Sequence, residues 1–127
     1  MTQAFIEHAN ITVGDPDRTA DMLHSIFGWH ERWRGPSRLG GRTIHVGTDS
    51  QYLAVYTDEA SDGTAKTHRK GAPLNHIGIQ VDDLDAAEAK VLAFGLKPFS
   101  HDDYEPGRRF YFFDENGIEF EIVSYSG

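Results

Sequence analysis

Two stretches of the chain, residues 6–13 and 74–81, alternate between apolar and polar residues as a half-buried strand does. Each stretch carries a histidine among its polar positions, His8 in the first and His76 in the second. Asn10 shares the polar face of the first stretch. Because successive side chains of a strand point to opposite faces, each histidine is expected to lie on the side of a sheet away from the apolar residues.

A helix is predicted after each of these strands. The first is capped by Asp15, which a proline follows at the first helical position, and it ends at Gly28. The second is capped by Asp82 or Asp83 and ends at Gly95. Each helix has an apolar stripe, formed by Thr19, Met22, Leu23, Ile26 and Phe27 in the first and by Leu84, Ala87, Val91 and Phe94 in the second.

Three further strands are predicted in each half, at 29–34, 42–47 and 52–57 and at 97–101, 108–113 and 118–125. The last two form a β-hairpin, because two runs of aromatic and β-branched residues flank the segment Asp114 to Gly117. Its Asn116-Gly117 pair readily adopts the positive φ angles of a tight turn. The stretch 58–73 is polar and has no period, so it is predicted to connect the two halves.

The two halves align with each other along the sequence. A shift of 68 places residues 6–13 on 74–81, and a shift of 67 after the helices places Phe27-Gly28 on Phe94-Gly95. Matching strand patterns, helix caps and helix ends in the same order indicate an internal repeat.

The chain is therefore predicted to be an α+β protein built from two βαβββ repeats. It is interpreted as one domain over residues 1–127, with repeat one at about 5–57, the connection at 58–73 and repeat two at about 74–125. The repeats are expected to form a curved mixed sheet around a concave groove, with the helices packed on its convex face.

The 67-residue shift also makes predictions about single side chains. It places Arg42 on Arg109 and His45 on Phe112. Since neighbouring residues of a strand alternate, His45 is then expected to point away from the face that Tyr111 occupies.

Composition limits the possible partners. The chain has 127 residues, of which 39% are hydrophobic and 12% aromatic, enough for a sizeable core. Its formal net charge of −8 disfavours nucleic acid and anionic membranes as partners. The absence of cysteine excludes disulfides and thiolate chemistry, and no signal-peptide pattern or long apolar run is present. A cytoplasmic protein is expected.

Three side chains are predicted to meet in the groove. His8 and His76 are equivalent by the repeat, and Glu121 joins them if Phe120 and Ile122 take the helix side of their strand. One histidine facing a sheet is more often a structural residue than a ligand. Two histidines with one carboxylate form the set that holds a divalent metal ion and leaves positions open for a substrate.

These residues and motifs resemble the vicinal oxygen chelate superfamily, which includes glyoxalase I, extradiol dioxygenases, and fosfomycin-resistance and bleomycin-binding proteins. The resemblance rests on Ile6-Glu7-His8, Leu74-Asn75-His76, both Phe-Gly helix ends and Phe113-Asp114-Glu115-Asn116-Gly117 followed by Glu121. It implies a divalent metal on His8, His76 and Glu121, with Fe2+ favoured and Mn2+, Zn2+ or Ni2+ as alternatives. Glu115 stands where the family turn has proline, and Ala54 stands where glyoxalase I has a fourth ligand.

A three-ligand set is similar to that of extradiol dioxygenases and fosfomycin-modifying enzymes. The hairpin, with His101, Phe110-Tyr111, Asp114 and Glu121, resembles the extradiol pattern, so extradiol-type dioxygenase chemistry on a small oxygen-rich substrate is the leading expectation. The alternatives are a fosfomycin-type resistance transferase and a metal-free bleomycin-type binding protein. By the family pattern Tyr111 lies near the substrate.

The other candidates line the predicted groove. His45 is a candidate general acid or base, and Asn10, Tyr52, Tyr56 and Arg109 are candidates for substrate binding. Family members of this length imply a homodimer. The two halves of one chain could pair around each site, or halves from two chains could do so, and the sequence leaves both open.

Overall fold

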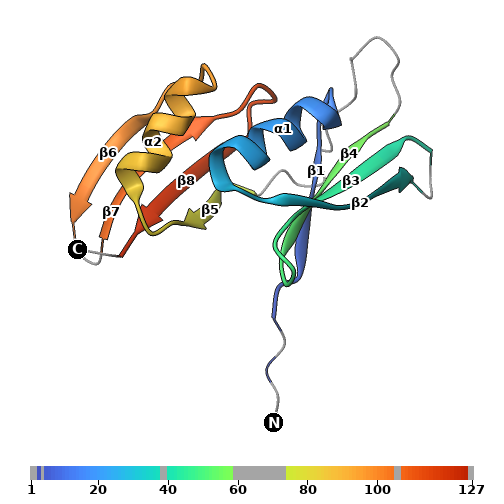
Figure 1. The fold of residues 1–127 in the computed structure, drawn as a ribbon, viewed down its shortest axis with the longest axis horizontal. Coiled ribbons are helices and arrows are strands. Elements are labelled where there is room, and N and C mark those ends of the chain that lie inside the picture. The colour runs from blue at the N-terminus through green and yellow to red at the C-terminus, as the bar shows by residue number, and fades with distance from the viewer. Residues whose placement is uncertain (1–2, 4, 38–39, 59–73, 105–106, 126–127) are drawn as a thin grey trace. The chain divides into compact units, whose positions relative to one another are not determined.

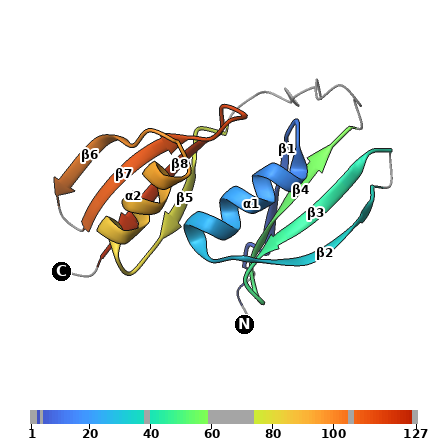
Figure 2. The ribbon, with the colours of Figure 1, turned by 45° about the horizontal axis from the view of Figure 1, so that its top comes forward.

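The computed structural model describes residues 3, 5–37, 40–58, 74–104 and 107–125. The chain divides into two compact units, Met1–Lys70 and Gly71–Gly127. Each unit contains one helix and one four-stranded mixed sheet (Figures 1 and 2). The boundary falls inside the predicted connection, which apart from residue 58 lies outside the described residues. In the described part of the chain, no helix is long and apolar enough to cross a membrane.

The first unit runs β1 (His8–Thr12), α1 (Pro16–Phe27), β2 (His30–Pro36), β3 (Arg42–Gly47) and β4 (Tyr52–Thr57). Its strands lie in the order β1-β4-β3-β2, with β1 parallel to β4 and the other pairs antiparallel.

The second unit repeats this topology with β5 (Ile77–Gln80), α2 (Leu84–Ala93), β6 (Phe99–Tyr104), β7 (Gly107–Phe113) and β8 (Glu119–Ser124). Its strand order is β5-β8-β7-β6, and only the β5–β8 pairing within this described sheet is parallel. The prediction of two βαβββ repeats is confirmed. β5 is shorter than the predicted strand 74–81, so His76 precedes the strand, and β6 begins two residues later than predicted.

Both helices begin at the predicted aspartates. The side chain of Asp15 accepts a hydrogen bond from the backbone N–H of Arg18 at 3.2 Å, and that of Asp83 accepts one from Ala86 at 3.0 Å. Asp83, not Asp82, is therefore the cap of α2. Helix α1 ends at Gly28, whose φ of 73° lies in the left-handed region that glycine adopts without strain.

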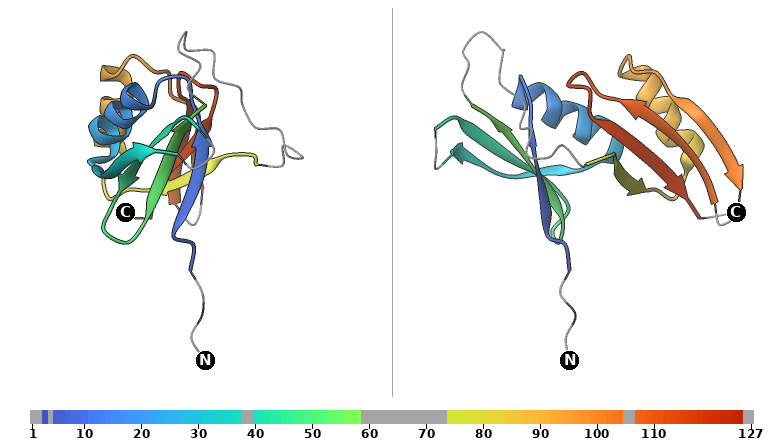
Figure 3. Two further views of the ribbon diagram at one scale, coloured as in Figure 1. Left: turned by 90° about the vertical axis from the view of Figure 1, so that its right-hand side faces the viewer. Right: turned by 180° about the vertical axis from the view of Figure 1, so that it is seen from behind.

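Each helix covers one face of its own sheet (Figure 3). In the first unit Leu23 of α1 and Val55 of β4 are fully buried. In the second unit three phenylalanines of β7 and β8 are fully buried, namely Phe110, Phe112 and Phe120. Because side chains alternate along a strand, the residues between these core positions lie on the opposite face of each sheet, which we call the open face.

The β7–β8 turn is held by one buried carboxylate. Oδ1 of Asp114 accepts hydrogen bonds from the backbone N–H groups of Asn116 and Ile118, both at 2.9 Å. Gly117 has a φ of 81°, as the predicted turn requires. The side chain of Asp114 thus orders the turn that contains Glu115.

The strand pairing corrects one part of the predicted alignment. His45 pairs with Ala54, and Tyr111 pairs with Glu121. Since Ala54 and Glu121 are equivalent, His45 corresponds to Tyr111 and not to Phe112. The reason is the turn: residues 48–51 join β3 to β4, whereas the five residues 114–118 join β7 to β8, so the shift is 66 before the turn and 67 after it.

The same correction pairs two arginines. Arg42 is equivalent to Arg108 and not to Arg109, because Arg42 pairs with Thr57 and Arg108 with Ser124. Both arginines point to the helix side. Arg42 lies 3.0 Å from Asp17 of α1, and Arg108 lies 3.2 Å from Asp85 of α2. Each unit therefore repeats one ion pair between the first turn of its helix and a central strand.

Candidate functional site

His8 lies on the open face of the first sheet. It pairs with Tyr52, and the two rings stack with their centroids 4.9 Å apart. Nδ1 of His8 is 3.0 Å from Oε1 of Glu7. A carboxylate can only accept, so this contact keeps the proton on Nδ1 and leaves Nε2 with its lone pair exposed for another partner.

The predicted substrate-binding residues of this half lie on the same face. Asn10 pairs with Ala54, which is buried and offers no side-chain ligand, as the alignment predicted. Tyr52 is half-buried between β1 and β3. The hydroxyl of Tyr56 lies 3.5 Å from the carbonyl oxygen of Gly40, so its polar end is directed toward the end of the sheet.

His45 belongs to this face as well, contrary to the prediction. Its ring stacks on Tyr52 at 4.5 Å and tilts against Trp33 at 5.0 Å. Burial lowers the pKa of His45 below the ordinary value of 6.5, and electrostatic interactions with the nearby His8 and Arg32 lower it further. His45 is therefore neutral near pH 7 and can accept or donate a proton.

His76 and Glu121 lie side by side on the open face of the second sheet. Nε2 of His76 is 2.9 Å from Oε1 of Glu121, and Nδ1 of His76 is 2.7 Å from Oδ1 of Asn75. With its proton on Nδ1, neutral His76 directs a lone pair at the carboxylate. Two acceptors at this distance require a proton or a cation between them.

Arg109 holds the second oxygen of the same carboxylate. Its Nη1 atom donates to Oε2 of Glu121 at 2.7 Å, and both side chains are only 12% exposed. Tyr111 pairs with Glu121 in the strand register, and its ring meets His76 edge-on at 5.8 Å. Glu121 is thus fixed in orientation, with one oxygen on Arg109 and the other facing His76.

The donor atoms suit a divalent metal ion. Adjacent donors with metal bonds of about 2.1 Å at right angles lie about 3 Å apart, close to the distance between His76 and Glu121. Glu7 and Asn75 occupy equivalent positions and hold the Nδ1 atoms of both histidines in the same way. Among the residues that the structure describes, no three His, Asp or Glu side chains gather closely enough to hold a metal.

The remaining histidines lie elsewhere. His101 faces the helix, with Nε2 at 2.7 Å from Glu88 of α2 and its ring stacked on buried Phe110. It is therefore on the side of the sheet opposite Glu121, and the predicted extradiol-like pattern loses its histidine. Nδ1 of His24 is 2.7 Å from the carbonyl oxygen of Trp29. His68 lies outside the described residues.

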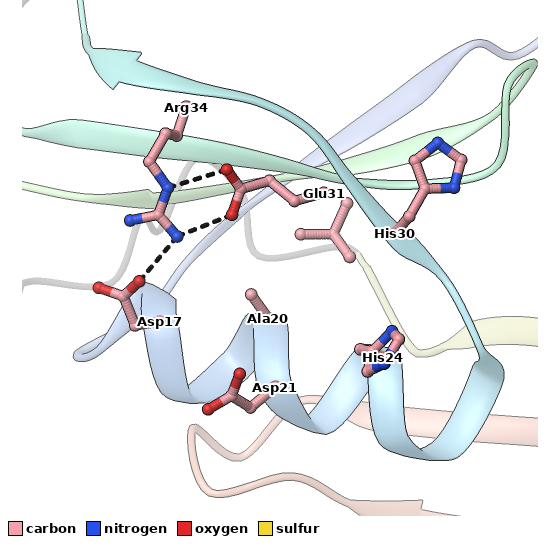
Figure 4. Close-up of a pocket in the computed structure, with 8 residues that line it drawn as sticks. Asp17, Ala20, Asp21, His24, His30, Glu31 and Arg34 are labelled. Atoms are coloured by element: carbon pink, nitrogen blue, oxygen red, sulfur yellow. Dashed lines mark hydrogen bonds and ion pairs between the residues drawn. The ribbon is translucent and has the colours of Figure 1, made fainter.

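A pocket of about 260 Å³ lies on the helix side of the first sheet (Figure 4). It is lined by Asp17, Ala20, Asp21, His24, His30, Glu31, Arg34 and Val46. Arg34 bridges Glu31 at 2.7 Å and Asp17 at 2.9 Å beside it. None of the predicted site residues lines this pocket, so it is separate from the open face.

Two aromatic residues that sequence reasoning missed flank the site. Trp33 pairs with His45, and Phe99 pairs with Tyr111, so Trp33 and Phe99 are equivalent. The ring of Phe99 stacks against Tyr111 at 6.0 Å. The shift of 66 that relates His45 to Tyr111 also relates Trp33 to Phe99, so the corrected alignment would have found this pair in the sequence.

Comparison with known proteins supports this architecture. A sequence model of the glyoxalase/bleomycin resistance protein/dioxygenase superfamily matches residues 5–122. The chain belongs to this superfamily. Comparison with curated protein sequences gave no significant match.

Several solved structures share the superfamily fold with this chain. A glyoxylase/bleomycin resistance protein/dioxygenase domain from Frankia sp. EAN1pec is 20% identical, with a TM-score of 0.80 over 97% of this chain and 93% of that one. TnmS3, an antibiotic binding protein from Streptomyces sp. CB03234, is 17% identical, with a TM-score of 0.75 and 98% of each chain covered. The fosfomycin resistance protein FosX from Listeria monocytogenes, complexed with Mn(II) and sulfate, is 18% identical, with a TM-score of 0.70 over 97% and 93%.

Proposed function

We propose that this protein is a metalloenzyme that holds a divalent metal ion with His8, His76 and Glu121 and binds two adjacent oxygen atoms of a small substrate. The observation that carries the proposal is the matched orientation of the two histidines. Both Nδ1 atoms are engaged by the preceding residue, so both Nε2 atoms are available, and one of them already faces a carboxylate. His8 reaches the site from the same chain or from a second copy.

The bound ion would act as a Lewis acid on the substrate oxygens and, if it is iron, would supply the redox chemistry that dioxygen requires. Glu121 is oriented for this task by Arg109, which also offsets its negative charge. The Mn(II) complex of the Listeria neighbour supports a divalent ion on this fold.

Extradiol-type cleavage is the reaction that we propose to test first. Tyr111 lies beside His76, where its hydroxyl could hold a substrate oxygen. His45, neutral and on the open face, could take a proton from a substrate hydroxyl. Both residues occupy equivalent positions in the two repeats.

A fosfomycin-type transferase is the second candidate function. The position of His101 weakens the extradiol assignment and so favours this alternative. The extradiol-like pattern includes His101, whereas His101 is paired with Glu88 on the helix side of the sheet, away from Glu121.

One experiment separates these functions. Protein purified without oxygen is analysed for bound metals, then assayed for dioxygen uptake with a panel of catechols and, separately, for fosfomycin consumption with water or a thiol. Glu121→Ala protein is the control. Dioxygen uptake lost in the control supports the extradiol reaction, and fosfomycin consumption lost in the control supports the transferase. If the protein retains much less than one metal ion per site after loading with Fe2+, Mn2+, Zn2+ or Ni2+, both proposed reactions are overturned. That result would favour a metal-free binding protein.

A further inference from the structure

A β-bulge in β2 changes which side chains reach the open face of the first sheet. Glu31 pairs with Val46 and Trp33 pairs with His45, so Arg32 is the extra residue between them. Glu31 consequently points to the helix side, as Arg34 does after the bulge. The guanidinium of Arg32 lies over the ring of Tyr52, 4.3 Å from its centroid.

Trp33 is held in a fixed position beside this arginine. A Cβ atom built on Gly35 would lie 2.6 Å from Cζ2 of Trp33, so the indole lies across the glycine, where no other residue leaves room. The other neighbour of the indole is His45, at 5.0 Å between ring centroids. Trp33 nevertheless remains 47% exposed, an unusually large fraction for an aromatic side chain packed in this way.

The bulge therefore presents a cation and an exposed indole together, next to a neutral imidazole. An arginine guanidinium matches a carboxylate through two parallel hydrogen bonds, and an indole face stacks on another aromatic ring. We propose that Arg32 and Trp33 form a binding subsite for aromatic carboxylates, in which Arg32 takes the carboxylate and Trp33 takes the ring.

The role of this subsite in catalysis rests on the proposed function. If that function holds, the molecule bound at the subsite is the substrate, and it lies on the face that bears His8. It names the substrate class as small aromatic acids. The chain has a formal net charge of −8, so it does not attract anions nonspecifically. Binding of a carboxylate therefore depends on a local cation such as Arg32.

The test uses metal-free protein, so that binding is measured apart from metal chemistry. Trp29 is replaced by Phe to leave Trp33 as the reporter, since the chain has two tryptophans and Trp29 packs on Phe27 at 5.0 Å. In the presence of EDTA the protein is titrated with benzoate, cyclohexanecarboxylate and benzyl alcohol, by calorimetry and Trp33 fluorescence. Cyclohexanecarboxylate lacks the aromatic ring, and benzyl alcohol lacks the charge. We expect benzoate to bind at least about tenfold more tightly than either of them.

Variants assign the two contacts. Arg32→Gln should weaken benzoate binding about tenfold or more, whereas Arg108→Gln, which removes an exposed arginine on the helix side of the other unit, should leave it unchanged. Gly35→Ala should displace the indole, change the Trp33 emission and weaken benzoate binding without removing either residue. Circular dichroism shows whether the Gly35→Ala variant folds. If it does not fold, benzoate binding by Arg32→Gln alone tests the subsite.

Equal affinity for benzoate and cyclohexanecarboxylate, or unchanged binding in Arg32→Gln, would overturn the subsite. These results are independent of the metal. Failure to bind any divalent ion would refute the proposed function and leave the benzoate result standing, whereas metal binding without benzoate binding would refute the subsite alone.

Discussion

His76, the residue just before β5, faces Glu121 of the neighbouring strand β8, with Nε2 of the histidine 2.9 Å from Oε1 of the carboxylate. Neither atom has a proton to donate when Asn75 holds the proton of His76 on Nδ1. The pair is thus arranged to hold a cation between its two atoms. This relationship motivates the first prediction.

Replacing any of the three proposed ligands should remove metal binding and leave the fold intact. His8→Ala, His76→Ala and Glu121→Ala are each expected to lower the metal content from about one ion per site to near zero, because the three residues lie on the open faces and not among the core residues. Elemental analysis after dialysis against the metal measures this, and circular dichroism checks the fold.

Glu119→Gln is the matched control. Glu119 lies two residues before Glu121 on the same strand, and it pairs with Phe113 instead of Tyr111. Its loss should leave the metal content unchanged. Equal loss from Glu119→Gln would show that overall charge, and not a defined ligand set, attracts the ion, and retention of metal in all three ligand variants would refute the site.

The second prediction concerns the residues that orient the histidines. Asn75→Leu removes the acceptor for Nδ1 of His76 and should weaken metal binding about 10- to 100-fold, the usual effect of losing such a partner. Asn75→Asp keeps an acceptor at the same position and should retain most of the affinity. Competition with a chelator of known affinity measures the difference. If both variants bind as tightly as the unmodified protein, the contact does not orient a ligand.

The sequence predicted the elements well because their signals are local. Asp15 and Asp83 cap their helices through their own side chains, and the hairpin turn depends on Asp114 and Gly117. These contacts span at most four residues, so the local pattern contains them. The shortening of β5 has a different cause: Ile77 is the first residue of β5 that pairs with β8, and a pairing limit cannot be read from one strand.

The candidate site was predictable only as far as alternation holds. His8, Asn10, Tyr52 and Tyr56 lie where alternation places them. The alignment of the repeats placed His45 on the wrong face, because a fifth turn residue in the second repeat shifts the alignment by one. Alternation could not place Arg32 and Trp33 on the open face, since a β-bulge breaks the alternation and depends on pairing with the neighbouring strand.

The third prediction uses the repeated ion pairs. Asp17 contacts both Arg34 and Arg42, whereas Asp85 contacts Arg108. The side chain of Asp17 is 51% exposed and that of Asp85 is 77% exposed. Asp17→Asn should therefore cost about 1 kcal/mol or less of unfolding free energy, and Asp85→Asn should cost less than that. Urea unfolding at pH 7 measures both values.

The cost of Asp17→Asn should also depend on pH. The hydrogen bond from Arg34 holds the pKa of Asp17 below its ordinary value of 3.8, and Arg42 adds to the effect. A carboxylate with a lowered pKa stabilises the folded state fully above its unfolded pKa and loses that contribution as the pH falls through its folded pKa. The difference between the two proteins should therefore be constant near neutrality and shrink below about pH 4. If the difference in unfolding free energy between the two proteins persists at low pH, the effect of Asp17→Asn comes from packing and not from the ion pairs.

The last prediction concerns how the ligands are shared. We expect a homodimer with two equivalent sites, because each site needs one His8, one His76 and one Glu121 and two-fold symmetry gives two of each. His8 belongs to the first unit, and the His76–Glu121 pair belongs to the second. The pair is complete within one unit, so only His8 has to be supplied from another.

Mixing His8→Ala with Glu121→Ala protein under conditions that exchange subunits identifies the supplier. If the ligands come from different chains, a mixed dimer has one site with both defects and one intact site, so metal binding should recover in up to about half of the sites of mixed dimers. A mixture of His76→Ala with Glu121→Ala is the matched control, since both defects lie in one unit and no intact site can form. Recovery in the first mixture alone requires shared ligands. No recovery, with exchange confirmed by mass-labelled subunits, places each site within one chain, and a monomer at micromolar concentration contradicts the dimer itself.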